Sequence, residues 1–398
     1  MSGGKIAIKT KITLFSVADI FMWFYILFAF VITSINSAPV FFQMRFVSLL
    51  FAGGFGYLQL LKGSVRNSRI ILFILAFAAS WAASFLIRGS GAYEPNLFLY
   101  SALYMGMAVN MVSHRHSVRI PGFLFFVVCA TSLVRLLILK EPIRGFLKDG
   151  TTYNFISVLL LFFLAFYCIA LIQNNEKIPY VAAIVFAWLS LLVYGRGGII
   201  TGLFFLVFVI FWGTKDETNR KKRGALRLTA VVTVIVGVVA LLAFLGYIRI
   251  AAFESVFAKF YEKNATDEPR LEIWSGYIRA CSKSLRDFIF GADSKRFFVD
   301  GNLHNAFVQL HSAFGMIPFL LLLYTFVRLA VYSFKTKRMY LLCLLLTIVI
   351  RSMTDKTAFQ GYCEPLFYYL AFTWLNVREK KRMVSGDGAA TDTEMNMG

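Results

Sequence analysis

Residues 153–173 read YNFISVLLLFFLAFYCIALIQ, an unbroken apolar run without a charged side chain. A helix of this length matches the hydrocarbon thickness of a bilayer. Backbone N–H and C=O groups in lipid must be hydrogen-bonded inside their own segment, so the run predicts a membrane-spanning helix. Similar blocks recur along all 398 residues, of which 59% are hydrophobic. A soluble domain cannot bury that fraction, and the blocks lack the alternation typical of an outer-membrane barrel.

We predict an all-α polytopic membrane protein, a single integral membrane domain over residues 1–398 with about twelve transmembrane helices. One long loop, 249–303, separates the ninth span from the tenth, and the Gly-, Asp- and Thr-rich tail, 384–398, is expected to be disordered. The predicted spans are 13–35, 40–61, 70–87, 97–112, 121–139, 153–173, 179–194, 198–213, 227–248, 304–332, 339–353 and 359–377.

Lys and Arg residues gather in the short linkers on one side of these spans, about three times as densely as on the other. The positive-inside rule places that side, with both termini, in the cytoplasm, and 249–303 becomes a periplasmic loop. This distribution accounts for the net charge of +20 without a nucleic-acid partner. The five cysteines show no disulfide or metal spacing, and neither a metal nor a cofactor is expected.

An arginine flanked by glycines joins the seventh and eighth spans, in the stretch Tyr194-Gly195-Arg196-Gly197-Gly198. An arginine near hydrocarbon is costly and is usually kept for a partner. The glycines let another group approach the backbone, and the N–H groups that begin the next helix attract anions. A phosphate or pyrophosphate suits this position. A tight helical hairpin with a snorkelling arginine explains the stretch equally well.

The long loop carries an arginine and a tryptophan four residues apart, Arg270 and Trp274. On a helix whose first turn holds Pro269, these two side chains share a face. An apolar stripe on such a helix favours a position at the membrane surface, with Arg270 in solvent. The stripe consists of Ile273, Trp274, Tyr277 and Ile278.

Two histidines mark the entry to the tenth span, His304 at its boundary and His311 two turns deeper on the same face. A histidine at a dry boundary can act as a general base near neutral pH, or it can simply cap a helix. Val308 stands where a metal-binding helix would repeat a ligand, which argues against a metal site. The alternative bases nearby are Glu272, Asp293 and Asp300.

A few charged residues fall inside or at the ends of other spans. Asp19, Arg45 and Arg135 are expected to pair between helices or to snorkel toward an interface. Arg351 and Asp355, four residues apart, are expected to form an ion pair. Carboxylates are too few in mid-span for a typical proton-coupled transporter.

The three segments, in this order and on this side, resemble the bacterial O-antigen ligase and Wzy-type polymerase family. The matching motifs are Arg-Gly-Gly after a short span, Arg-x-x-x-Trp in the outer loop, and His304-Asn305 ahead of Gly315. The motifs cover about 194–315, while the hydropathy plan covers the whole chain. Two positions depart from the family pattern, because Gly195 stands where Ser is frequent and Pro269 where Gly is frequent.

The resemblance implies an inverting, metal-independent glycosyltransferase in the bacterial inner membrane, acting at its outer face on an undecaprenyl-diphosphate-linked glycan. It implies that Arg196 and Arg270 bind the diphosphate and that His304 is the catalytic base toward the acceptor hydroxyl. Arg279, Tyr277 and Asn305 are candidate substrate-binding residues. No cofactor is implied.

The preferred function is polymerisation of repeat units into O-antigen, capsule or exopolysaccharide, with the growing glycan as acceptor and a chain-length regulator as a candidate partner. A ligase that moves the glycan to lipid A core would use the same chemistry. A flippase or transporter for the lipid-linked oligosaccharide is the second alternative, and it requires a charged internal cavity. A glycosyltransferase with acidic residues in its first outer loop is disfavoured, because Asn36–Pro39 contains no carboxylate.

Overall fold

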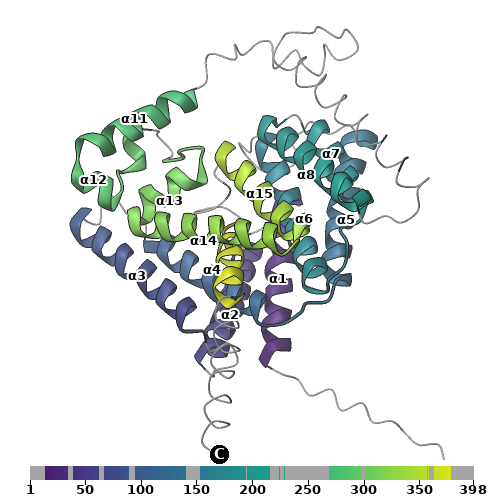
Figure 1. Cartoon of the computed structure of the whole chain (residues 1–398), viewed down its shortest axis with the longest axis horizontal. Coiled ribbons are helices and arrows are strands. Elements are labelled where there is room, and N and C mark those ends of the chain that lie inside the picture. The colour runs from purple at the N-terminus through teal and green to yellow at the C-terminus, as the bar shows by residue number, and fades with distance from the viewer. Residues whose placement is uncertain are drawn as a thin grey trace, which may run out of the picture.

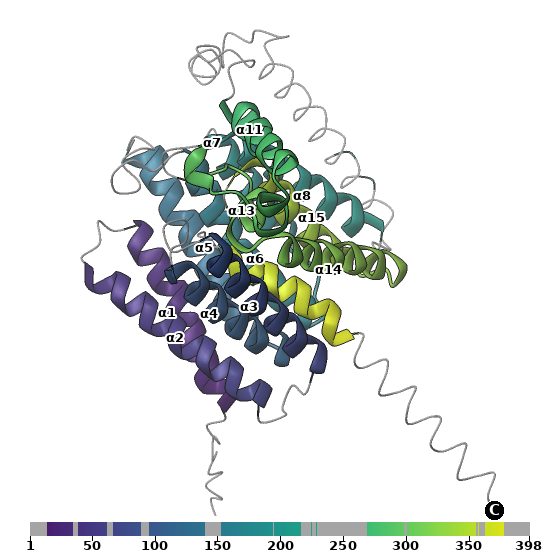
Figure 2. The same cartoon turned by 90° about the vertical axis from the view of Figure 1, so that its left-hand side faces the viewer.

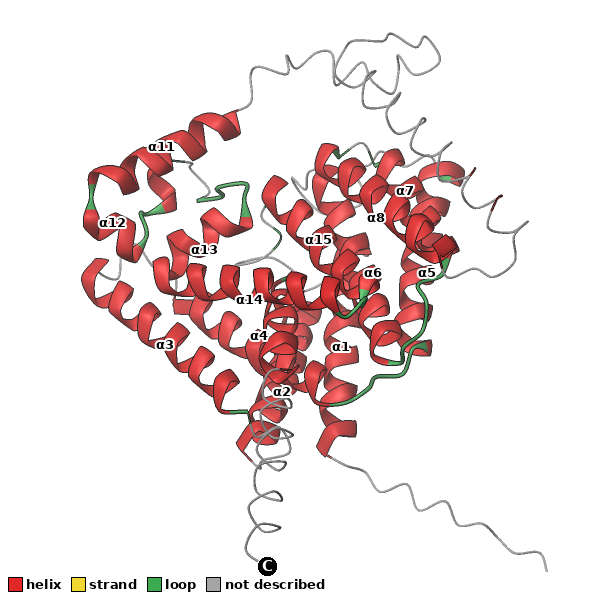
Figure 3. Cartoon of the chain, in the orientation of Figure 1, coloured by secondary structure: helices red, strands yellow, loops and turns green. Residues whose placement is uncertain are grey.

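The computed structural model describes residues 14–34, 39–61, 67–88, 95–139, 153–193, 195–215, 224, 228, 269–297, 301–355, 357 and 363–377. Within these ranges the regular elements are all helical and no strand occurs (Figure 3). Six of the described helices are long and apolar enough to cross a membrane, and three shorter apolar helices accompany them. The chain is therefore an all-helical protein of the multi-pass membrane type, while the count of twelve spans stays a prediction.

The first eight predicted spans each coincide with one helix to within a few residues. The helix α5 continues through a π-helical turn, Val134–Ile138, and the ninth predicted span, 227–248, lies outside the described residues apart from Leu228. The eight helices are α1 (Leu14–Ser34), α2 (Pro39–Leu61), α3 (Ser68–Arg88), α4 (Pro95–Ser113), α5 (Arg119–Leu133), α6 (Tyr153–Gln173), α7 (Tyr180–Leu192) and α8 (Arg196–Lys215).

The helix α6 forms the centre of the bundle, because almost its whole length is buried inside the protein. It packs against α5, α7, α8 and α15 (Met339–Thr354). A helix that is apolar on every side, as α6 is, belongs in such a position. Peripheral helices instead expose an apolar stripe at helical spacing, as Leu320, Leu323 and Val327 do on α14 (Met316–Lys335). Lipid acyl chains would cover these apolar stripes.

Glycines allow α2 and α4 to pack backbone against backbone. A Cβ atom placed on Gly56 would overlap the carbonyl of Gly106, and one placed on Gly106 would overlap the carbonyl of Gly53. Small residues at such crossings are typical of membrane helices, where close van der Waals contact replaces the hydrophobic effect as the driving force.

The prediction of one continuous tenth span over 304–332 is wrong. The helix α13 (Ala306–Phe314) ends at Gly315, and α14 begins at the next residue. Gly315 has φ +83°, a conformation that stops a helix and that L side chains rarely adopt. A Cβ atom there would also lie 2.7 Å from the carbonyl oxygen of Ile289. With nine residues, α13 is too short to cross a bilayer.

The described part of the long loop, from residue 269, is mostly helical and packs on α13 at one end of the bundle (Figures 1 and 2). The predicted helix at Pro269 is confirmed as α11 (Pro269–Lys283), which α12 (Leu285–Phe290) and a 3-10 turn (Ser294–Arg296) follow. The predicted surface stripe is partly wrong. Ile273 and Tyr277 are buried in a small separate core, whereas Ile278 is exposed.

The last two predicted spans correspond to α15 and to a final helix over 364–377. The predicted tail, 384–398, and the loop residues before 269 lie outside the described part of the chain.

Candidate functional site

The three motif segments meet at the C-terminal end of α15, at residues Met353 to Asp355. The Arg-Gly-Gly segment reaches it through Gly197, where a Cβ atom would overlap Thr354 Oγ1 and lie 2.9 Å from Arg351 Nη1. The second glycine, Gly198, lies as closely on Ser157 of α6. The glycines of the motif are therefore required for packing at the start of α8. The side chain of Arg196 lies outside the described part of the structure.

The loop arginine reaches the same point from α11. Arg270 Nη1 donates a hydrogen bond to the carbonyl oxygen of Thr354 at 3.0 Å. One turn further along α11, Trp274 Nε1 donates to the carbonyl oxygen of Leu303 at 2.7 Å. The expectation of a solvated Arg270 is thus wrong in part, because the side chain is half-buried and hydrogen-bonded. The Arg-x-x-x-Trp face joins the end of α15 to the residue before His304.

The His304-Asn305 segment is the third that contacts the end of α15. Asn305 caps α13, because its Oδ1 accepts from the backbone N–H groups of Phe307 and Val308 at 2.9 and 3.2 Å. Its Nδ2 donates to the carbonyl oxygen of Met353 at 3.3 Å. One amide side chain therefore starts α13 and fixes it to α15.

His304 occupies a strained backbone position beside a carboxylate. Its φ is +50°, and its backbone N–H donates to Asn302 Oδ1 at 2.9 Å. Its ring Nδ1 lies 3.8 Å from Asp355 Oδ1, and the two side chains are 23% and 14% exposed. A histidine with φ in the left-handed region costs about 1–2 kcal/mol. Strain of this kind is common at functional sites, where the surroundings impose it.

Asp355 is shared between His304 and an entirely buried arginine. Arg351 Nη2 lies 3.3 Å from Asp355 Oδ2, which confirms the predicted ion pair. Arg351 also donates to Thr354 Oγ1 at 3.0 Å and to Ser157 Oγ at 3.3 Å. The sequence predicted this pair as structural and gave no sign that the same carboxylate faces His304.

The second histidine, His311, is engaged at both ring nitrogens. Its Nε2 lies 2.8 Å from the carbonyl oxygen of Phe288, which can only accept, so Nε2 carries the proton. Its Nδ1 therefore accepts from the hydroxyl of Tyr277 at 2.7 Å. Burial lowers the pKa of His311 and raises the pKa of Tyr277, so both groups stay neutral near pH 7. His311 is a packing residue rather than an alternative base.

Two candidate substrate-binding residues lie away from Thr354. The Tyr277 hydroxyl is buried against His311, and Arg279 is exposed on α11. Of the alternative bases, Glu272 is exposed, Asp293 caps the 3-10 turn through the N–H of Lys295, and Asp300 lies outside the described residues. Among the bases named from the sequence and described by the structure, His304 is therefore the one that lies beside Asp355, next to the Thr354 carbonyl that Arg270 contacts.

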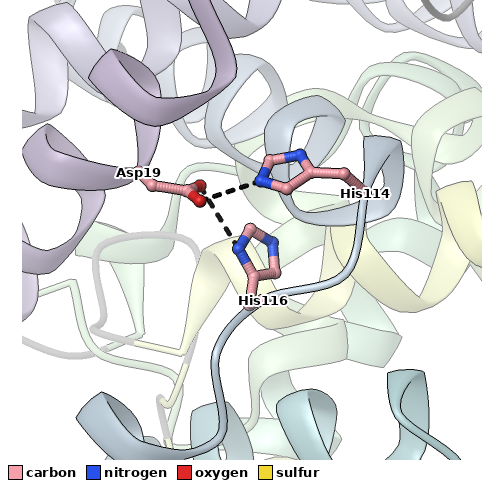
Figure 4. Close-up of side chains that lie close together, drawn as sticks. All are labelled: Asp19, His114 and His116. Atoms are coloured by element: carbon pink, nitrogen blue, oxygen red, sulfur yellow. Dashed lines mark hydrogen bonds and ion pairs between the residues drawn. The ribbon is translucent and has the colours of Figure 1, made fainter. Parts of the chain in front are cut away.

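A second polar cluster, at the other end of the bundle, was not recognised in the sequence. Asp19 was expected to pair between helices or to snorkel toward an interface, and it contacts His114 and His116 in the turn between α4 and α5 (Figure 4). Arg45 lies instead over the ring of Tyr25 at 5.9 Å. The His-x-His pattern was the available signal.

Neither a protein-family model nor a curated protein sequence matches the chain. The family suggested by the three motifs therefore stays a prediction.

Proposed function

We propose that this protein is a membrane glycosyltransferase that polymerises undecaprenyl-diphosphate-linked repeat units at the outer face of the bacterial inner membrane. The observation that supports it is the convergence on Met353 to Asp355 of three segments far apart in the chain. One supplies a helix N-terminus, one an arginine and one a histidine. Together they provide the groups needed to hold a diphosphate beside a general base.

The base is His304. With the Nδ1 proton directed at Asp355, Nε2 accepts the proton of the acceptor hydroxyl. The oxygen of that hydroxyl forms a bond to the anomeric carbon of the donor as the bond from that carbon to the diphosphate oxygen breaks. The diphosphate leaves with the bonding electron pair, and a single displacement inverts the anomeric centre. The contact of 3.8 Å is longer than a hydrogen bond, and substrate binding is expected to shorten it.

The leaving diphosphate is held by Arg270, Arg196 and the first N–H groups of α8. Arginine forms paired, charge-assisted hydrogen bonds with phosphate oxygens. The start of a twenty-residue helix adds unpaired N–H donors and the positive end of its dipole. The bond from Arg270 to the Thr354 carbonyl uses Nη1 alone, so the remaining donors of the guanidinium fork can serve a ligand. Fixed positive charge at this point stabilises the leaving group as it forms.

The test is chain growth by purified protein in liposomes supplied with undecaprenyl-diphosphate repeat units and EDTA. His304→Asn is the informative variant, because asparagine tolerates the left-handed backbone that His304 adopts, so the fold is kept while the base is lost. We expect a ladder of products from the wild type and none from the variant. Glu272→Gln is the control, since it removes the exposed acid on the neighbouring helix.

Each other outcome has a defined meaning. Loss of the ladder in Glu272→Gln but not in His304→Asn would reassign the base. Transfer of one glycan block to added lipid A core, without a ladder, would make the protein a ligase. Lipid flipping without transfer to either acceptor would refute the enzyme and leave a transporter.

A further inference from the structure

Three potential metal ligands converge where α1 meets the turn between α4 and α5 (Figure 4). Asp19 Oδ2 lies 2.8 Å from His114 Nε2, and Asp19 Oδ1 lies 3.2 Å from His116 Nδ1. One atom from each residue can be chosen so that all three lie within 4.8 Å of one another. Two of the four histidines of the chain are thus placed on one carboxylate.

The burial of the three side chains fits a site with one open position. The His116 side chain is only 2% exposed, and neither of its ring nitrogens makes a hydrogen bond among the residues that the structure describes. Its Nδ1 nevertheless faces Asp19. A buried imidazole nitrogen without a hydrogen bond is costly, and a metal ion would satisfy it. Asp19 and His114 are each 23% exposed, which leaves a path for an ion from solvent.

A chain of buried amides orients the carboxylate. Asn110 Nδ2 donates to Asp19 Oδ1 at 3.0 Å, and Gln59 Nε2 donates to Asn110 Oδ1 at 2.8 Å. Both amides are fully buried. Hydrogen bonds of this kind behind a ligand are typical of metal sites, because they fix the direction of the ligand oxygens.

The turn that carries the histidines is also held from behind, by the end of α6. The backbone N–H of His116 donates to Gln173 Oε1 at 3.2 Å, and its carbonyl accepts from Asn174 Nδ2 at 2.9 Å. The ligand positions are therefore built into the fold before any ion binds.

We propose that Asp19, His114 and His116 form a site for a divalent transition-metal ion of the zinc class, with solvent as a further ligand. Imidazole nitrogen with carboxylate oxygen is the donor set that such ions prefer over Mg²⁺ or Ca²⁺. At bond lengths of about 2.0–2.2 Å, tetrahedral ligands lie about 3.3 Å apart, which the 3.2 Å between Asp19 Oδ1 and His116 Nδ1 matches. The hydrogen-bonded contact of 2.8 Å between Asp19 Oδ2 and His114 Nε2 opens by about 0.5 Å when an ion replaces the shared proton. The bound ion would join α1 to the turn between α4 and α5.

This site is separate from the proposed transfer reaction. Ser157, which contacts Arg351, and Gln173, which contacts His116, lie at opposite ends of α6. The rise of an α-helix puts these two positions about 24 Å apart. Removing the ion is expected to change stability and to leave the chemistry at His304 unchanged, so either proposal can fail without the other.

The test uses the full chain, purified without a polyhistidine tag, stripped with a chelator and titrated with Zn²⁺ by calorimetry. We expect about one equivalent to bind per chain, and Co²⁺ in its place to give the visible absorption bands of tetrahedral nitrogen and oxygen ligation. The Co²⁺ spectrum needs no variant, so it tests the site even if a ligand substitution unfolds the protein.

Three substitutions locate the ion. His114→Gln and His116→Gln should each weaken Zn²⁺ binding by more than about tenfold and abolish the rise in melting temperature that Zn²⁺ gives the wild type. His304→Asn, the matched histidine variant at the other cluster, should keep both. A wild type that binds no Zn²⁺, or a His116→Gln variant that binds it as tightly as the wild type, would overturn the proposal.

Discussion

Replacing Asp355 by asparagine tests whether the carboxylate assists His304 during transfer. The change keeps the shape of the side chain and removes its charge, which lies 3.8 Å from the ring Nδ1. Once His304 has taken the proton, attraction at that distance is worth about 4 kcal/mol at an effective dielectric constant of about 20, and about 1 kcal/mol in bulk water. Each tenfold in rate corresponds to about 1.4 kcal/mol. Both side chains keep some contact with solvent, so we take about 2.8 kcal/mol, between these limits, and expect kcat to fall by about a hundredfold.

The assay is the initial rate of chain growth as a function of lipid donor concentration. Asp355 acts through His304 as a positioning residue, because its carboxylate faces the ring Nδ1 of that histidine. Its loss should therefore lower kcat while KM for the donor stays close to the wild-type value. Arg351 keeps its bonds to Thr354 and Ser157, which limits the effect on folding, and the melting temperature measures what remains.

The matched control is Asp287→Asn. Asp287 is a buried carboxylate that contacts Arg286 and Arg296, at 3.5 and 3.4 Å, in the α12 region. This variant removes the charge of another buried carboxylate, whose two arginine partners are half-exposed, and it should keep full activity. If Asp355→Asn slowed growth no more than Asp287→Asn, or raised KM with kcat unchanged, the pairing of Asp355 with His304 would have no part in catalysis.

Three further outcomes follow from contacts in the fold. Gly197→Ala should destabilise the protein by about 1–3 kcal/mol and reduce chain growth, because the added Cβ atom overlaps Thr354. The control is Gly54→Ala, whose added Cβ atom meets no other atom within 4 Å, and it should be neutral in the same melting and chain-growth assays. Tyr277→Phe leaves the buried Nδ1 of His311 without its donor and should cost about 1–3 kcal/mol in thermal unfolding. Burial lowers the pKa of His311 in the folded protein, so the unfolded chain binds a proton at this histidine more readily. The melting temperature should therefore fall as the pH drops below about 6.5, and it should fall less in His311→Gln.

Much of the fold could be predicted from the sequence, because length and hydropathy decide where a helix can cross lipid. The run 153–173 coincides with α6 from end to end. The break at Gly315 could not be found in this way, since α13 and α14 are both apolar and hydropathy does not register a single residue with positive φ. Gly315 belongs to a predicted motif, but its positive φ and the close approach of the Ile289 carbonyl exist only in the folded chain.

The site was predictable only in part, for a different physical reason. Arg270 and Asn305 stood out through their residue types and spacing, and both reach α15. Their partners there are the backbone carbonyls of Thr354 and Met353, which carry no residue-specific signal. The Arg351–Asp355 pair was predictable from helical spacing, but its contact with His304 joins segments about fifty residues apart and exists only in the folded chain.

Rare carboxylates within apolar helices would have been the better starting point. Asp19, Asp355 and Glu364 lie in or at the end of helices, and each has a partner from a distant segment. Glu364 accepts from Ser101 on α4 and from Tyr368. A charged carboxylate is not stable in an apolar bundle without such partners, because its desolvation penalty exceeds the free energy that nearby packing contributes. Each such carboxylate indicates that a polar group from another segment faces it, and at Asp19 and Asp355 that group is a histidine.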